Sequence, residues 1–106
     1  MNSNGFFFTK LHNKYVRVFV DEILYIEGSR NYCKIVTSAN SFTVHNTLKQ
    51  LQKTFGDDQF IRSHKSFLVN LSQVKSFDRI SIHFASKVVP LSTNFRNDFE
   101  NRLQII

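Results

Sequence analysis

A run of cationic and polar side chains between Phe60 and Asn70 is the part of the sequence best suited to bind a ligand. It reads FIRSHKSFLVN and places Arg62, His64 and Lys65 close together. All three side chains can donate hydrogen bonds to phosphate oxygens or to the edge of a guanine base. These residue types at this spacing therefore favour recognition of a polyanion over bond-making chemistry.

The same run contains hydroxyl groups and apolar residues that could hold it in place. Ser63 and Ser66 can bond phosphate oxygens. Phe60, Phe67 and Val69 flank the polar residues, and we expect them to fix the segment to the core. A cationic loop on a rigid core is what reading a nucleic-acid groove requires.

A second stretch, Ile23–Tyr32, also differs from ordinary strand sequence. It reads ILYIEGSRNY, so an apolar run to Ile26 is followed by the polar loop Gly28–Asn31 and then by an aromatic residue. Tyr25 is expected to have a structural role.

Other kinds of chemistry find no support in the sequence. The histidines stand at positions 12, 45, 64 and 83, and these spacings match no common zinc motif. There is no glycine-rich phosphate loop and no G-x-S-x-G motif. The adjacent acids Asp21-Glu22 and Asp57-Asp58 are typical of solvated turns. We expect no catalytic site, no metal and no cofactor, so the chain is not expected to be an enzyme.

The charge is positive and unevenly distributed. The formal net charge is +6 and the pI is about 9.8. Between residues 28 and 77 only Asp57 and Asp58 oppose seven cations: Arg30, Lys34, Lys49, Lys53, Arg62, Lys65 and Lys75. A clustered positive field attracts polyanions, and nucleic acid is the commonest in the cytoplasm. A solvated surface that happens to be basic remains the alternative.

Alternating residues predict the strands that must position these segments. Val16, Val18 and Val20 would share one face of a strand over 15–20, and Cys33 and Ile35 one face of the next. Ser38–Asn40 is a plausible hairpin turn before a return strand with Phe42 and Val44 turned inward. Later, Ile80, Ile82 and Phe84 are expected to face the core. Pro90 predicts an edge strand.

The periodicity changes to that of a helix twice. Thr47 and Gln50 fit a capping box, after which Leu48, Leu51 and Phe55 share one helical face and Gly56 stops the helix. A final helix is expected after Ser92 or Thr93. Its apolar stripe is Phe95, Phe99 and Leu103.

The chain is long enough to bury one core without staples. We expect residues 1–106 to form a single domain, with its core at about 6–103. Cys33 is the only cysteine, so no disulfide within the chain is possible, and we expect this residue to be buried. The sequence shows no membrane span and no signal peptide. These features favour the cytoplasm and no membrane contact by this domain.

The two polar stretches and the run Pro90-Leu91-Ser92 resemble the LytTR domain, the DNA-binding module of the LytR/AlgR family of bacterial response regulators. That family carries an I-L-Y-I-E signature, then F-x-R-x-H-[RK]-S-[FY]-[LIV]-V-N, then P-[LIV]-S. The resemblance runs from about Phe6 to Leu103. It implies a mostly β fold of about ten short strands in three antiparallel sheets with one or two short helices.

The resemblance also implies which residues contact double-stranded DNA, through loops that enter successive grooves. The expected contacts are Arg30, Asn31 and Tyr32 in a first loop, Arg62, His64, Lys65 and Ser66 in a second, and Thr93, Asn94 and Arg96 in a third.

Two positions depart from the pattern of the family. The family often has Arg directly after the P-[LIV]-S element, where this chain has Thr93-Asn94. Asn can pair with adenine where Arg would pair with guanine, so the base preference at this point is open. Lys65 lies where Arg is also common, and a lysine cannot form the bidentate fork. Contact with phosphate alone is therefore expected for Lys65.

For the whole protein, the resemblance implies the output domain of a two-component transcription regulator. A receiver or sensor domain would lie elsewhere in the full-length protein, since these 106 residues contain none. The family binds paired direct repeats, so we expect a monomer alone and a dimer on DNA. The target sequence and the regulated genes are not readable from the residues.

Two alternative functions stay open. Tyr15, Phe19 and Tyr32 could stack on bases, as in small β domains that bind RNA or single strands. The basic face could instead meet an acidic protein.

The sequence also bears on the roles of two polar residues. For His64, a DNA contact and a structural hydrogen bond inside the turn are equally favoured. Asn70 is expected to satisfy backbone groups at the end of a strand.

Overall fold

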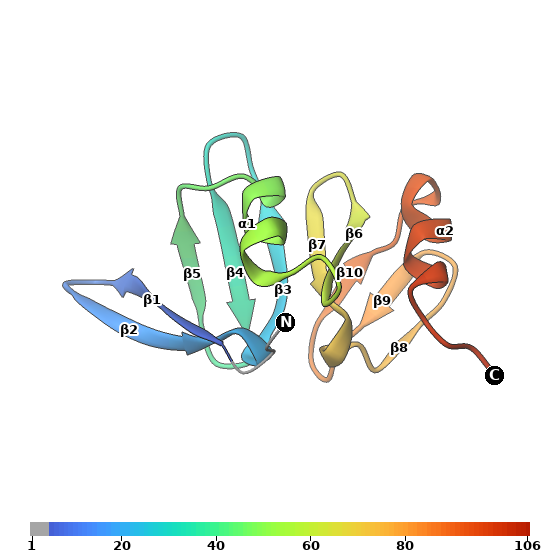
Figure 1. The fold of residues 1–106 in the computed structure, drawn as a ribbon, viewed down its shortest axis with the longest axis horizontal. Coiled ribbons are helices and arrows are strands. Elements are labelled where there is room, and N and C mark those ends of the chain that lie inside the picture. The colour runs from blue at the N-terminus through green and yellow to red at the C-terminus, as the bar shows by residue number, and fades with distance from the viewer. Residues whose placement is uncertain (1–4) are drawn as a thin grey trace.

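The computed structural model describes residues 5–106. In this range the chain forms ten strands in three antiparallel sheets, two α-helices and two short 3-10 helices (Figure 1). In chain order the elements are β1 (Phe6–Leu11), β2 (Lys14–Phe19), η1 (Val20–Glu22), β3 (Ile23–Gly28), β4 (Cys33–Thr37), β5 (Ser41–Val44), α1 (Leu48–Phe55), β6 (Phe60–His64), β7 (Phe67–Asn70), η2 (Leu71–Gln73), β8 (Ser76–Phe77), β9 (Ser81–His83), β10 (Val88–Pro90) and α2 (Thr93–Asn101). The expected mostly β class with three antiparallel sheets is confirmed.

The central sheet has five strands in the order β5-β4-β3-β7-β6. A two-stranded sheet, β1-β2, projects beyond the β5 side of it, and a three-stranded sheet, β10-β9-β8, lies on the other side (Figure 1). The pairing of β3 with β7 joins segments about 40 residues apart in the sequence. This pairing brings together the two polar stretches that were identified in the sequence.

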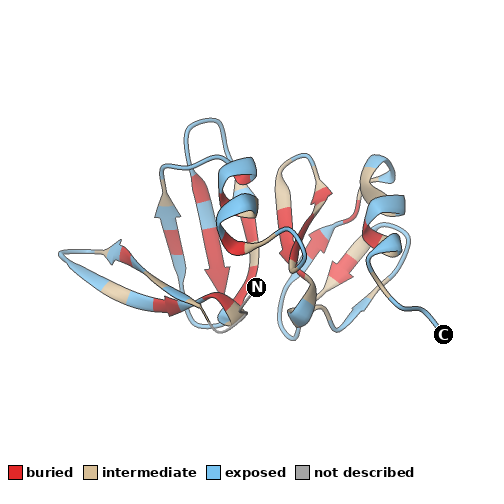
Figure 2. Ribbon diagram, in the orientation of Figure 1, coloured by how far each residue is buried: buried red, intermediate tan, exposed pale blue. Residues whose placement is uncertain are grey.

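Each face of the central sheet covers its own apolar cluster. Ile26 and Leu68 are opposite each other in the register of β3 and β7, and both belong to the cluster beneath α1. Tyr25 and Val69 form the neighbouring pair and point to the other face, where the second cluster contains Phe99 of α2. Buried residues follow the strands in this alternating way (Figure 2).

The predicted alternation is correct in most strands. Val18, Val20, Cys33, Ile35 and Phe42 are all buried. The register of β4 and β5 places Ile35 opposite Phe42, so the hairpin turn at 38–40 closes as expected.

The prediction for Ile80 is wrong. This side chain is 71% exposed, whereas Ile82 is fully buried. The Oδ1 atom of Asp78 accepts hydrogen bonds from the backbone N–H groups of Ile80 (3.0 Å) and Ser81 (2.9 Å). Ile80 therefore lies in a tight turn, and the strand begins only at Ser81.

Helix α1 begins and ends as the sequence predicts. The backbone N–H of Gln50 donates to Oγ1 of Thr47 at 3.1 Å, and the backbone N–H of Thr47 donates to Oε1 of Gln50 at 2.9 Å. This is a complete capping box. Gly56 ends the helix with a positive φ of 103°, a conformation that glycine adopts without strain.

Helix α2 follows the edge strand β10, which pairs with β9 alone. Ser92 is its N-cap, but the Ser92 side chain makes no capping hydrogen bond. Phe99 is fully buried, and its ring meets that of Phe77 edge-on at 5.1 Å. Phe95 and Leu103 are only partly buried, so the apolar stripe packs mainly through its middle residue.

Asn70 has the structural role that the sequence predicted. Its side chain is fully buried, and Nδ2 donates to the Ile23 carbonyl at 2.8 Å. Its Oδ1 accepts from the backbone N–H (3.1 Å) and the hydroxyl (2.8 Å) of Ser72, and from Nε2 of Gln59 (3.2 Å). The amide therefore joins β7, η2 and the start of β3.

From Gly5 onward, no helix has both the length and the apolar character needed to cross a membrane.

Candidate nucleic-acid interface

The β3–β4 loop and the β6–β7 turn lie side by side at one end of the strands of the central sheet. The backbone N–H of Gly28 donates to the Ser66 carbonyl at 2.8 Å, directly beyond the last paired residues of β3 and β7. Two segments that the sequence suggested for the same chemistry therefore form one surface, although they are more than 30 residues apart in the chain.

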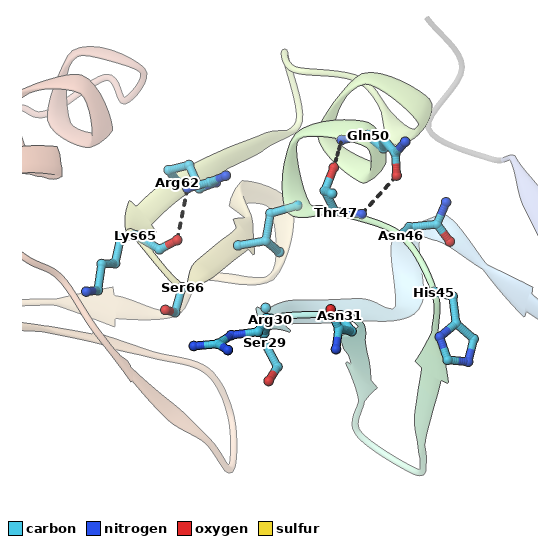
Figure 3. A pocket seen from close by; sticks show the side chains of 12 residues that line it. Ser29, Arg30, Asn31, His45, Asn46, Thr47, Gln50, Arg62, Lys65 and Ser66 are labelled. Carbon is cyan, nitrogen blue, oxygen red and sulfur yellow. Dashed lines mark hydrogen bonds between the residues drawn. The ribbon is translucent and has the colours of Figure 1, made fainter.

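A groove of about 390 Å³ opens between these two loops and the start of α1 (Figure 3). Its lining is rich in hydrogen-bond donors and contains no Asp or Glu. The residues that line it are Gly28, Ser29, Arg30, Asn31, His45, Asn46, Thr47, Leu48, Gln50, Arg62, Lys65 and Ser66. Arg30, Arg62 and Lys65 give it a positive potential that suits an anion, and the hydroxyl and amide groups can share in binding phosphate oxygens.

Arg62 organises the second loop as well as contributing charge to the groove. Its Nη1 donates to the carbonyl oxygen of Lys65 at 3.0 Å, across the turn (Figure 3). Its Nε is buried and has no hydrogen-bond partner among the described residues. Because a guanidinium has five N–H donors, one can hold the turn while others remain for a ligand.

His64 is used inside the turn. Its Nδ1 accepts a hydrogen bond from the backbone N–H of Ser66 at 3.0 Å, and its ring meets that of Phe67 edge-on. A neutral imidazole that accepts at Nδ1 carries its proton on Nε2, which leaves one donor available. His64 does not line the groove.

Ser63 was expected from the sequence to lie in the polar loop, and that prediction is wrong. Strand β6 extends to His64, and Ser63 is fully buried within it. The Ser63 carbonyl accepts from the backbone N–H of Ser92 at 2.8 Å, which ties the start of α2 to β6. A buried hydroxyl cannot reach a phosphate. The turn between β6 and β7 consists of Lys65 and Ser66 alone.

The first loop is well exposed. Arg30, Asn31 and Tyr32 all lie on the surface, and the backbone N–H of Ser29 donates to the Tyr32 carbonyl at 2.8 Å to close the loop. Arg30 and Asn31 line the groove, whereas Tyr32 does not.

The residues expected in a third loop lie in the first turns of α2. Thr93 and Asn94 are exposed. Arg96 instead donates to the Arg79 carbonyl through both Nε (3.0 Å) and Nη2 (2.8 Å), so it fastens α2 to the turn before β9. None of these three residues lines the groove, and they form a second surface that is joined to the first through β6.

Five groove residues were not expected at the site from the sequence: His45, Asn46, Thr47, Leu48 and Gln50. The capping box marked Thr47 and Gln50 as a helix start but gave no indication of what that start lies against. Gly28 was the available signal, because its missing side chain lets Leu48 approach β3 closely. The carbonyl of Asn46 also accepts from Sγ of Cys33 at 3.0 Å.

Cys33 itself is buried, as predicted. Burial raises the pKa of its thiol above the ordinary value, and the nearby charge of Arg62 partly offsets this. The thiol form therefore persists at neutral pH, which suits a packing role. Across residues 5–106 no group of three or more His, Cys, Asp or Glu side chains is placed to hold a metal ion.

Gly28→Ala should destabilise the domain, by about 1–3 kcal/mol, as overpacking of a filled site does. A Cβ at this position would lie 2.8 Å from both Cγ and Cδ1 of the buried Leu48. Urea denaturation followed by circular dichroism measures the loss. In a double-mutant cycle, Leu48→Ala should cost less stability in the Gly28→Ala background than alone. Independent, additive effects would contradict the proposed contact.

Comparison with known proteins identifies the family of this chain. A model of the LytTr DNA-binding domain matches residues 13–104. The chain belongs to this family. The family is one of DNA-binding domains, not of enzymes.

Two curated relatives come from Bacillus subtilis. The sensory transduction protein LytT is 29% identical over an alignment of 97 positions, gaps included, which covers 83% of this chain and 40% of LytT. The transcriptional regulatory protein NatR is 29% identical over 62 residues, which are 58% of this chain and 27% of NatR. The chain thus spans well under half the length of either relative.

A solved structure shares the fold. It is described as the LytTr DNA-binding domain of a methyl-accepting/DNA response regulator from Bacillus cereus. The TM-score is 0.82 at 20% sequence identity, over 94% of this chain and 97% of that one. The LytTR-like arrangement of three sheets is therefore shown.

Proposed function

We propose that this domain binds double-stranded DNA sequence-specifically, by loops that enter successive grooves, as the output domain of a bacterial transcription regulator. One observation carries the proposal beyond family membership. Two loops distant in the sequence converge with the start of α1 on a groove that contains three cationic side chains and no acid. Such a groove fits the sugar–phosphate backbone of a nucleic acid.

The residues divide into two kinds of contact. Lys65 and Ser66, at the tip of the β6–β7 turn, are placed to position the backbone through phosphate oxygens. Arg30 and Arg62 carry forked donors, and Asn31 carries one donor and one acceptor, that match base edges in the major groove, and Tyr32 stands beside them. His64 would add only the N–H at Nε2.

The start of α2 would supply a separate contact. Thr93 and Asn94 are exposed and lie outside the groove, which supports contact with another part of the duplex. Asn94 favours adenine at that point. Arg96 would act by holding α2 in place, since two of its guanidinium nitrogens already donate to the Arg79 carbonyl.

The larger assembly is part of the proposal. Both curated relatives are named for regulation or sensory transduction and are more than twice as long as this chain. We place this domain, residues 1–106, beside a receiver or sensor domain in a cytoplasmic protein. Two copies would bind paired direct repeats and meet only on DNA.

The test is selection of bound duplexes from a random DNA library at near-physiological salt, with a single-stranded competitor present. We expect one enriched motif, arranged as a direct repeat. Binding of that motif should weaken steeply with salt, with a slope in log K against log salt of about −0.9 per neutralised phosphate. Lys65→Ala should flatten the slope by about 1.

Salt-sensitive binding without an enriched motif would contradict sequence-specific reading. If the single-stranded competitor displaces the bound duplexes, the RNA or single-strand alternative is favoured instead.

A further inference from the structure

The outward face of the β1–β2 hairpin displays aromatic rings that the core does not use. Phe6, Phe8, Tyr15 and Phe19 are 51%, 54%, 67% and 42% exposed. The antiparallel register pairs Phe6 with Phe19, Phe8 with Arg17 and Lys10 with Tyr15, so these six residues form one continuous face. We call these six residues the hairpin face.

The opposite side of the same hairpin packs against the protein. Phe7, Leu11 and Val16 lie against the cluster beneath α1, and the ring of Phe7 is 5.0 Å from that of Phe55. The hairpin is thus held in place by its inner side. Its outer aromatic residues are not needed for that packing, and large exposed apolar patches of this kind mark interaction sites.

Charge accompanies the aromatic rings. The guanidinium of Arg17 lies 4.3 Å from the ring centroid of Phe6 and 5.3 Å from that of Phe8. Lys10 adds a second cation, and the hairpin face contains no Asp or Glu. Arg17 makes no ion pair with any residue between 5 and 106.

We propose that the hairpin face is a docking site for a protein segment that carries carboxylates among apolar side chains. Apolar groups of the partner would cover the exposed edges of the rings. A carboxylate would meet the guanidinium of Arg17, whose planar fork suits that group. This partner would be different from the DNA in the groove.

The geometry disfavours two other occupants. A second copy would bring together two faces that each carry two cations and no acid, so neither copy could supply a carboxylate to the other. Bases of a single strand need free flat rings to stack on. Here Arg17 covers Phe6, and the Phe6 ring meets Phe8 at 84° and Phe19 at 70°, so these rings are arranged edge-to-face.

The hairpin face also lies apart from the proposed DNA surface. None of its residues lines the groove. In Figure 1 the β3–β4 loop and the β6–β7 turn lie at the top of the molecule, whereas β1 and β2 extend from its lower left. A partner on the hairpin could therefore bind at the same time as DNA, which suits communication between this domain and another protein segment.

The test is selection from a phage-displayed library of random peptides against the domain. We expect enriched peptides to combine Asp or Glu with large apolar residues. Their synthetic versions should bind at least tenfold more weakly to Phe8→Ser and to Arg17→Gln. Ile80→Ser, which removes an exposed apolar side chain in the turn before β9, is the matched control and should bind as the native domain does. Binding of the selected duplex shows that each variant is folded.

Four results would overturn the proposal. The selected peptides could lack acids, or bind all variants equally. A single-stranded 20-nucleotide DNA could bind the native domain and lose affinity in Phe8→Ser, which would assign the face to nucleic acid. Sedimentation could show self-association that Phe8→Ser abolishes, which would assign the face to a second copy.

Discussion

Replacing Arg62 by Ala should weaken binding of the selected duplex by about 1–3 kcal/mol, or roughly five- to 150-fold. The substitution removes a cation from the groove and also removes the donor that holds the Lys65 carbonyl across the turn. Fluorescence anisotropy with a labelled duplex measures the change. Circular dichroism should show an intact fold, because Arg62 is only partly buried.

Two variants separate the contributions of Arg62. Arg62→Lys keeps the charge but loses the fork, so it should recover the salt-dependent part of the affinity and leave discrimination between motif variants impaired. Arg17→Ala removes the same charge from the hairpin face, outside the groove, and should bind the duplex nearly as the native domain does. If Arg62→Ala binds normally, or if Arg17→Ala is equally weak, Arg62 is not a specific contact.

The order of the elements was predictable from the sequence because its signals are local. Alternation at Val16 and Val18 and the capping box at Thr47 each depend on residues a few positions apart. Even the role of Asn70 followed from its place at the end of a buried run. The error at Ile80 has a local cause as well, since the Asp78 side chain captures two backbone N–H groups and delays the strand.

The groove could not be predicted from residue patterns in the same way. It depends on β3 pairing with β7, which alternation alone does not specify, and on Leu48 fitting against Gly28. The residue types near the groove were informative, but their directions were not. Ser63 and Ser66 looked equivalent in the sequence, yet the strand turns the first into the core and leaves the second beside the groove.

Arg96 illustrates the same limit at the start of α2. Resemblance to the family placed it with Thr93 and Asn94 as a contact residue. In the fold its guanidinium reaches a backbone carbonyl 17 residues away, a partner that no spacing in the sequence indicates. Two of its five N–H donors therefore hold α2 against this turn, while its charge and its other donors remain at the surface.

Phe60→Ala should cause the largest loss of stability, about 3–5 kcal/mol, as truncation of a buried Phe does. Phe60 is fully buried at the start of β6, and its ring is 5.6 Å from that of Phe55, which in turn contacts Phe7. Its backbone N–H donates to the Gly56 carbonyl (3.0 Å), and its carbonyl accepts from Nε2 of Gln52 (3.1 Å). The backbone of Phe60 therefore joins β6 to α1, and its ring packs on Phe55, which contacts Phe7 of the N-terminal hairpin.

A loss of this size is a large part of the 5–15 kcal/mol that typically stabilises a domain. Since Arg62 follows only two residues later, duplex binding should fall with the folded fraction. Phe8→Ala is the matched control: it removes the same side chain from a 54% exposed position and should cost less than about 1 kcal/mol. Urea denaturation of both variants measures the two losses of stability. Similar losses at the two positions would contradict the argument that the burial of Phe60 determines its contribution to stability.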